Sequence, residues 1–206
     1  MRIALISALY HSIAPISVAF ETMWPEPKLA NILDTSLSGD LANGHSLDSM
    51  TPRFLRLAHY AVDTGADAIL FTCSAFGPCI EALAAEFPNM PVLKPNEAMI
   101  EDAEPFGRVG LMATFGPSLN TLPAEFGRPI RMKLIEGALA ALDVGDVATH
   151  DRLSAEAAES FASECDVIAL GQFSLARAAD GIAKATGLPV LTTPGSAVKK
   201  LQRLLA

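Results

Sequence analysis

The sequence predicts an α/β fold with two pseudo-symmetric lobes, each a small parallel sheet flanked by helices. Three observations lead to this prediction. Short apolar runs alternate with amphipathic stretches, the runs show no alternation of apolar and polar residues, and the second half repeats the pattern of the first. Apolar runs without alternation are typical of parallel strands that are covered on both faces. Alternation of strands with helices is typical of a parallel sheet.

Six apolar runs are predicted to be strands, at residues 3–7, 68–72, 92–93, 109–113, 167–170 and 190–191. The stretches between them carry helix signals. We expect Thr51 to cap a helix whose first residue is Pro52 and which Gly65 closes, because these residue types are favoured at those positions. Pro78 is expected to open the next helix.

An internal repeat supports two lobes of similar structure. Residues 65–103 follow the same pattern as residues 164–201, with Asp67 aligned to Asp166, and this order extends to the strands that begin the two halves. Self-similarity in the same order favours a duplication over chance.

The repeat also sets the expected boundaries and the expected place of the active site. We expect a first lobe at residues 1–104 and a second at residues 105–206, with the C-terminal helix as a candidate to pack onto the first lobe. Ligands bind at the carboxyl ends of the strands in open α/β sheets. We therefore expect the active site in a cleft between the lobes.

Composition limits the classes of partner. The chain has 206 residues, of which 50% are hydrophobic and 18% charged, with a formal net charge of −8. No basic stripe is present to pair with phosphates, so we expect no nucleic acid. No apolar run has the roughly 18 residues that span a membrane. Three cysteines without a CxxC pair suggest neither disulfides nor zinc, and we expect a cytoplasmic protein.

The stretch "ADAILFTCSAFGP" places Cys73 where a buried strand ends and a helix is expected. The positive end of the helix dipole should lower the pKa of this thiol. Backbone N–H groups, with the hydroxyls of Thr72 and Ser74, should then bind a substrate carboxylate. The alternative is that Cys73 is a small buried hydrophobic residue. We expect Cys79 to pack in the core and Cys165 to be structural.

Other strand ends contribute further candidate residues. Ser7 closes the first strand and His11 lies in the loop that follows. Thr114 and Ser118 lie in the matching loop of the second lobe. His11 is a candidate acid or base because histidine titrates near neutral pH. A lone histidine in a loop is more often an ordinary surface residue. The remaining histidines have no partners at metal-ligand spacing, so no metal is expected.

The motifs resemble the aspartate/glutamate racemase superfamily, which includes hydantoin and allantoin racemases, maleate cis-trans isomerase and arylmalonate decarboxylase. "ILFTCSAFGP" resembles the first cysteine motif of that family, and "RVGLMATFGPS" the strand and hydroxyl loop that open its second lobe. "CDVIALGQFSLA" resembles the segment with the second cysteine, and "MPVLKPNEAM" and "LPVLTTPGSAV" resemble the strand and helix that end each lobe.

This resemblance implies two α/β lobes, no cofactor, a small carboxylate as substrate, and a homodimer or higher homo-oligomer. It also implies that one thiol removes the α-proton and an opposite thiol returns a proton. In this chain the second thiol position holds Gln172, with Ser174 nearby. An amide does not transfer protons in this way.

Four interpretations follow from the missing thiol. In the first, His11 completes a two-base racemase. In the second, Cys73 alone protonates a substrate after decarboxylation of a malonate-like acid; the resembling decarboxylase carries its one cysteine at the position of Gln172. In the third, Cys73 adds to a double bond as a nucleophile, as in cis-trans isomerisation of a dicarboxylic acid. In the fourth, the chain binds a small carboxylate without catalysis.

Overall fold

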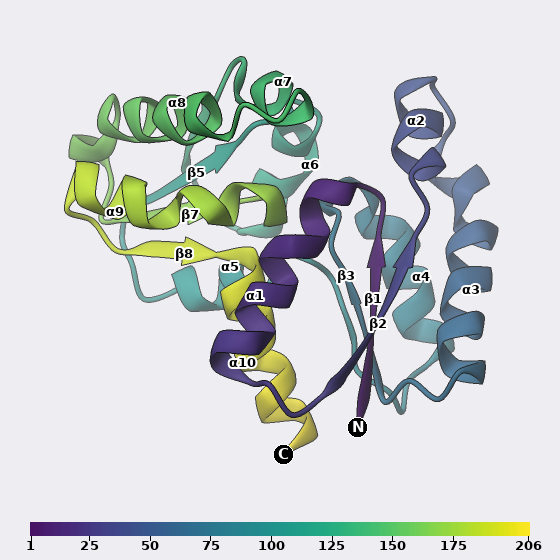
Figure 1. Ribbon diagram of the computed structural model, residues 1–206. Coiled ribbons are helices and arrows are strands. Elements are labelled where there is room, and N and C mark those ends of the chain that lie inside the picture. Colours follow the sequence, from purple (N-terminus) through teal and green to yellow (C-terminus); the bar gives the residue numbers. More distant parts are fainter. The chain divides into compact units, whose positions relative to one another are not determined.

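The computed structural model describes residues 1–206, which form two compact units (Figure 1). Unit 1 comprises Met1–Pro95 and Ala197–Ala206, and unit 2 comprises Asn96–Ser196. Each unit contains a parallel four-stranded sheet, in the order β2-β1-β3-β4 in unit 1 and β6-β5-β7-β8 in unit 2. The two sheets have the same strand order, which confirms the predicted α/β fold with two similar lobes.

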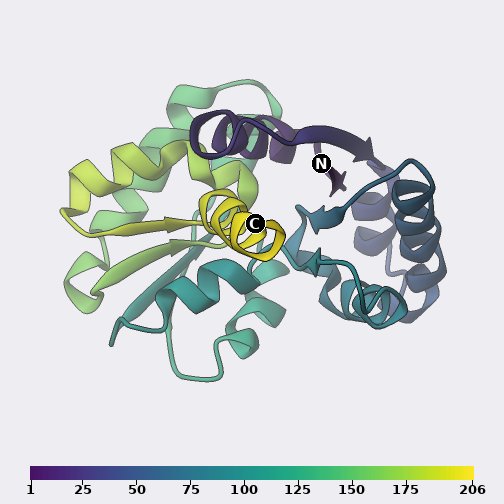
Figure 2. The ribbon, with the colours of Figure 1, turned by 90° about the horizontal axis from the view of Figure 1, so that it is seen from below.

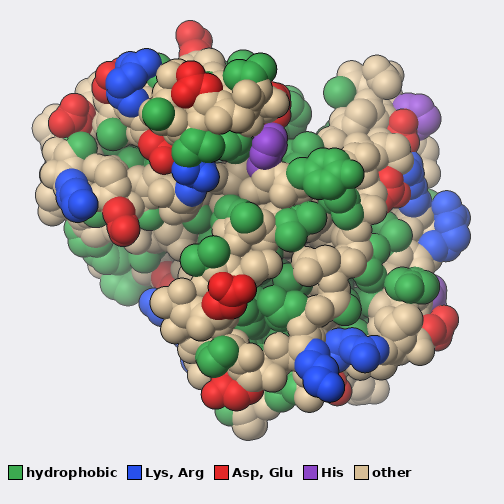
Figure 3. Space-filling view, in the orientation of Figure 1, with side chains coloured by type: hydrophobic (Ala, Val, Ile, Leu, Met, Phe, Trp, Pro, Cys, Tyr) green, Lys and Arg blue, Asp and Glu red, His purple; other side chains and the backbone are tan.

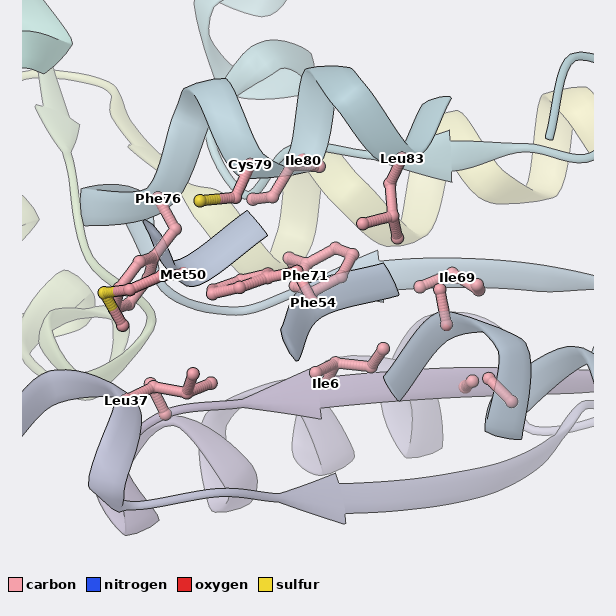
Figure 4. Close-up of a cluster of buried hydrophobic side chains, with 14 residues drawn as sticks. Ile6, Leu37, Met50, Phe54, Ile69, Phe71, Phe76, Cys79, Ile80 and Leu83 are labelled. Carbon is pink, nitrogen blue, oxygen red and sulfur yellow. The ribbon is translucent and has the colours of Figure 1, made fainter. Parts of the chain in front are cut away.

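The elements of unit 1 alternate between strands and helices. They are β1 (Arg2–Ser7), η1 (Tyr10–Ser12), α1 (Ile13–Met23), β2 (Lys28–Leu33), α2 (Ser36–Ala42), α3 (Leu47–Asp63), β3 (Ala68–Phe71), η2 (Ser74–Phe76), α4 (Gly77–Glu86) and β4 (Val92–Leu93). Helices α3 and α4 pack on the sheet through a cluster of buried side chains that includes Ile6, Phe54 and Phe71 (Figure 4). Burial of this apolar surface is the main force that holds the layer together.

The elements of unit 2 repeat this pattern. They are α5 (Glu97–Ala103), β5 (Val109–Ala113), α6 (Ser118–Glu125), β6 (Arg131–Leu134), α7 (Ala138–Asp143), α8 (Val147–Glu159), η3 (Ala162–Glu164), β7 (Val167–Leu170), η4 (Phe173–Ala178), α9 (Ala179–Thr186) and β8 (Val190–Thr192). The last helix, α10 (Thr193–Leu205), begins in unit 2 and continues into unit 1.

Helices cover both faces of the sheet of unit 2, as Figure 2 shows. On one face Ile168 and Leu170 pack with residues of α7, α8 and α9. On the other face Val167 and Ala169 pack with residues of α5 and α6. Successive residues of β7 therefore enter two different cores, which explains why this strand is apolar without alternation.

The six predicted strands are confirmed to within a residue at each end, but β2 and β6 were not predicted. Both lie at the edge of a sheet, and neither contains a buried residue. Their sequences, "KLANIL" and "RMKL", mix polar and apolar residues as edge strands commonly do. The apolar run that identified the other strands, including the edge strands β4 and β8, is therefore absent from them.

The predicted start of α3 is wrong. The helix begins at Leu47, and its cap is Ser46, whose hydroxyl accepts a hydrogen bond from the backbone N–H of Ser49 at 3.3 Å. Pro52 lies inside the helix, beyond its first turn, and lacks the N–H that would donate to the carbonyl oxygen of Asp48. The predicted end is confirmed, because Gly65 follows the cap residue of the helix with a φ of 83°.

The same hydrogen bond from a backbone N–H to an aspartate recurs in both units and supports the duplication. The backbone N–H of Arg2 donates to the Asp67 carboxylate at 2.7 Å, and that of Arg108 donates to the Asp166 carboxylate at 2.9 Å. In each unit the contact joins the start of the first strand to the residue before the third strand. This agreement of position is the structural counterpart of the aligned aspartates in the sequence.

The compact units differ in their boundaries from the two predicted lobes. Helix α5 belongs to unit 2, where Met99 and Ala103 pack in a core with residues of β5 and β7. Residues 197–206 belong to unit 1. The helix that ends each half of the repeat, α5 or most of α10, therefore belongs to the unit formed mainly by the other half.

Candidate active site

Cys73 lies two residues beyond the end of β3, in extended backbone with φ −125° and ψ 120°. It immediately precedes η2, and α4 begins only at Gly77. The Cys73 side chain is partly exposed and its apolar part contacts the core of unit 1. It is therefore neither a fully buried core residue nor an open surface thiol.

The electrostatic environment of this thiol is opposite to the prediction. Burial raises the pKa of Cys73 from 9.0 to about 11, and the backbone N–H of Ala75, which donates to the sulfur, offsets only part of the increase. The predicted lowering of the pKa is wrong because η2 separates Cys73 from the first turn of α4, and a helix dipole acts mainly within its terminal turn. Cys73 is accordingly a protonated thiol at neutral pH.

Two hydroxyls lie beside Cys73 at the ends of β1 and β3. The register of these strands pairs Ile6 with Phe71, so that Ser7 lies next to Thr72. The Thr72 hydroxyl donates to Oγ of Ser7 at 2.8 Å, and both side chains are buried. The proton of the Thr72 hydroxyl is used in this hydrogen bond. Ser7 accepts through its oxygen, so its own hydroxyl proton can be donated to another group.

In unit 2, Gln172 stands where Cys73 stands in unit 1. It lies two residues beyond the end of β7, in extended backbone, and immediately precedes η4. Its Oε1 atom accepts hydrogen bonds from the backbone N–H of Thr114 at 2.5 Å and from the Thr114 hydroxyl at 2.9 Å. The ends of β5 and β7 are thereby joined through a side-chain amide.

The remaining predicted residues lie on the loops and turns beyond the strand ends. Ser74 is in η2, Ser118 begins α6, and Ser174 is in η4, and all three side chains are buried. His11 lies in η1 and is partly exposed. Direct hydrogen bonds join Ser7 to Thr72 and Thr114 to Gln172. That the two groups share one cleft remains a prediction.

The other two cysteines lie in the cores, as expected. Cys79 is fully buried among the labelled side chains of Figure 4, and its sulfur contacts Leu47 O at 3.3 Å. Cys165 is 2% exposed and its sulfur lies 3.4 Å from the carbonyl oxygen of Phe161. Burial raises the pKa of both thiols.

One ion pair that holds the turn after Gln172 was missed in the sequence. Arg177 of η4 donates to both carboxylate oxygens of Asp151 on α8, at 2.9 and 3.2 Å, and His150 Nδ1 lies 2.7 Å from the same carboxylate. Burial raises the pKa of Asp151, but the hydrogen bonds and charges of Arg177 and His150 outweigh this and lower it. A charged residue inside the apolar segment "GQFSLARAA" was the available signal.

The charged side chains form no basic stripe on the face shown in Figure 3, where Lys and Arg are scattered among acidic and apolar residues. None of the helices has the length and apolar character required to cross a bilayer. No three His, Cys, Asp or Glu side chains are grouped as metal ligands would be.

Comparison with known proteins identifies the family. The sequence model described as Asp/Glu/hydantoin racemase matches residues 40–201, and a search of curated proteins finds no match. Three solved structures illustrate the similarity of fold. Allantoin racemase from Klebsiella pneumoniae has a TM-score of 0.78 at 18% identity over 100% of this chain and 87% of that one.

Glutamate racemase from Francisella tularensis subsp. tularensis SCHU S4, solved with D-glutamate, has a TM-score of 0.74 at 15% identity over 99% of this chain and 80% of that one. Arylmalonate decarboxylase has a TM-score of 0.67 at 18% identity over 99% of this chain and 92% of that one. The family match covers most of the chain, and these structures share its fold. This chain belongs to the Asp/Glu/hydantoin racemase family.

Proposed function

We propose that this chain is a cofactor-independent acid–base enzyme in which Cys73 transfers one proton to or from the carbon next to a carboxylate of a small acid. The single observation that carries the proposal is the state of Cys73. It is a partly exposed thiol at the carboxyl end of an inner strand, and it is protonated at neutral pH. Similarity to racemases and a decarboxylase supports chemistry at such a carbon.

The substrate carboxylate is proposed to bind beside Cys73, at the ends of β1 and β3. The free proton of the Ser7–Thr72 pair and the hydroxyl of Ser74 are donors of the kind that a carboxylate accepts. These donors are neutral, so they orient the acid without adding a charge next to the thiol. In the second unit Thr114, Ser118 and Ser174 are proposed as further binding residues.

A specific observation favours one reaction over the others that the sequence left open. A thiol whose pKa is about 11 is a poor nucleophile at neutral pH, because the thiolate is the reactive form. This disfavours nucleophilic addition in a cis-trans isomerisation. It favours donation of a proton, for which the thiol is already in the required state.

Decarboxylation of a malonate-type acid fits a single proton donor. The bond between the central carbon and one carboxylate breaks, carbon dioxide leaves, and the electron pair remains on the central carbon as an enolate. The Sγ–H bond of Cys73 then breaks and its proton forms the new C–H bond. The thiolate recovers its proton from water. One thiol is sufficient, and no proton is required from Gln172.

The proposal is tested by incubating the protein in heavy water with amino acids, hydantoins, malonates and maleate, and following deuterium uptake by NMR and mass spectrometry. We expect uptake at the carbon next to the carboxylate, and its loss in Cys73→Ser. Cys165→Ala is the matched control, because Cys165 is in a core and should retain activity. Full activity of Cys73→Ser would refute the role of the thiol. Inactivity of the wild-type protein on the whole panel would favour a non-catalytic carboxylate-binding protein.

We also propose, from the family resemblance, that the protein forms a homodimer or a higher homo-oligomer. Light scattering coupled to gel filtration measures the mass of the particle in solution and so tests this proposal directly.

A further inference from the structure

The orientation of the Gln172 amide follows from its contact with Thr114. Strands β5 and β7 are parallel, with Met112 beside Leu170, and the backbone N–H of Gly171 donates to Met112 O at 2.9 Å. Two residues further along the chain from Met112, just beyond the end of β5, the backbone N–H of Thr114 donates to the side chain of Gln172 at 2.5 Å. The side-chain amide of Gln172 thus takes the place of a backbone carbonyl in the hydrogen bonding between the two strands.

A backbone N–H can only donate, so the atom that it contacts must be the amide oxygen. The contact with Thr114 therefore fixes the assignment of Oε1 and Nε2, which in an isolated amide would be ambiguous. The second hydrogen bond, from the Thr114 hydroxyl at 2.9 Å, also uses Oε1. The NH₂ group of Gln172 is consequently directed away from Thr114.

The NH₂ group has no other use within the chain. It makes no hydrogen bond to the protein, and Nε2 is not sealed from solvent. It lies at the carboxyl end of an inner strand, which is where open α/β sheets bind their ligands. It offers two hydrogen-bond donors, and its own oxygen is already occupied.

We propose that Gln172 is a specificity-determining residue, whose fixed NH₂ group donates a hydrogen bond to a carboxylate or carbonyl oxygen of the ligand and rejects an ammonium group. The proposal rests on the function proposed above, because it concerns the ligand of the same enzyme. A carboxylate or a carbonyl oxygen accepts from an NH₂ group. An ammonium group has only donors, so it would face another donor without an acceptor between them. Diacids and hydantoins should therefore be preferred over amino acids that have no second carboxylate, such as alanine.

The orientation is tested without any ligand by hydrogen exchange of the Thr114 amide. Gln172→Glu keeps an oxygen at the position of Oε1, so the Thr114 amide should stay protected and the protein should unfold at a similar temperature. Gln172→Met removes the acceptor, and the same amide should exchange faster. Equal protection in Gln172→Met and the wild type would overturn the assigned orientation.

Specificity is tested by titrating malonate, maleate, hydantoin and alanine into the wild type and both variants by calorimetry. For malonate we expect Gln172→Met to bind about 10-fold to 100-fold more weakly, the loss typical of a hydrogen bond to a charged group. Gln172→Glu should bind malonate at least as weakly, because it also introduces a negative charge. Its affinity for alanine relative to malonate should rise at least 10-fold, since a carboxylate accepts from an ammonium group.

The outcomes separate the two proposals. If the wild type binds or converts an acid of the panel and Gln172→Glu shows the same preference between malonate and alanine, Gln172 is not a specificity determinant and the proposed function stands. If Cys73→Ser retains full turnover while Gln172→Glu changes the preference, the role of the thiol fails and this inference stands. If the wild type binds none of the four acids, both are overturned.

Discussion

Cys73 should ionise at a much higher pH than an ordinary cysteine. Its pKa is raised from 9.0 to about 11 by burial, and 11 − 9.0 gives a difference of about two pKa units. At neutral pH the thiolate population should therefore be about 100-fold smaller than that of an unperturbed thiol. Alkylation of Cys73 at neutral pH should be correspondingly slow, because only the thiolate attacks.

The same difference in pKa gives the sign of the effect on stability. The folded pKa lies above the unfolded one, so Cys73 contributes stability below pH 9.0, and this contribution is lost as the pH rises from 9.0 to about 11. After allowance for partial exposure of the side chain, the loss should be about 1 to 2 kcal/mol. Denaturant unfolding at a series of pH values, compared with Cys73→Ser, isolates this contribution.

The pKa itself is measured from the ultraviolet absorbance of the thiolate across a pH titration. The difference between the wild type and Cys73→Ser removes the signals of Cys79 and Cys165. Alkylation with iodoacetamide at each pH, followed by peptide mass spectrometry, assigns the reactive sulfur. A midpoint at or below about 8.5, the value of a free cysteine, would refute the argument that burial dominates over the nearby N–H groups.

Three further predictions concern the stability of the fold, each measured by denaturant unfolding. Ser46→Ala should cost about 1 kcal/mol, because it removes the hydroxyl that caps α3. Gly110→Ala should cost about 1 to 3 kcal/mol, since its Cβ would lie 2.6 Å from the sulfur of Cys165, and the cost should be smaller in a Cys165→Ala background. Gly65→Ala should destabilise the fold by about 1 kcal/mol, because Gly65 has a φ of 83°. Gly39 lies in α2, and a Cβ added there would meet no other atom within 4 Å. Gly39→Ala should therefore be neutral or should stabilise the fold by up to about 1 kcal/mol. Equal effects at Gly65 and Gly39 would contradict the conformational argument.

The inner strands of both sheets are predictable because each is covered on two faces. A run such as residues 167–170 must be apolar throughout, since its successive side chains enter different cores. Edge strands carry no such requirement. Strands β2 and β6 mix polar and apolar residues and escaped prediction, whereas the edge strands β4 and β8 each begin with two apolar residues and were predicted. The start of α3 was misplaced because Thr51 followed by Pro52 matches the residue preference of a helix cap and first position. Ser46 is also a favoured cap residue, and it is the one that directly precedes the first helical residue, Leu47.

The sequence predicts where the candidate residues lie more reliably than how they behave. Cys73 was placed at a strand end because an apolar run stops just before it. The direction of its pKa depends on how closely protein surrounds the sulfur and on where α4 begins, and neither is encoded in a local pattern. The bond between Gln172 and Thr114 depends on the register of β5 and β7, so no spacing in the sequence reveals it.

The most direct test of the proposed chemistry is the configuration of the product formed in heavy water from a prochiral disubstituted malonate. If Cys73 is the sole proton donor, the product should carry deuterium at the new C–H position and should be a single enantiomer, and Cys73→Ser should form none of it. A racemic deuterated product would contradict the account, because it would require a second group that delivers protons to the opposite face.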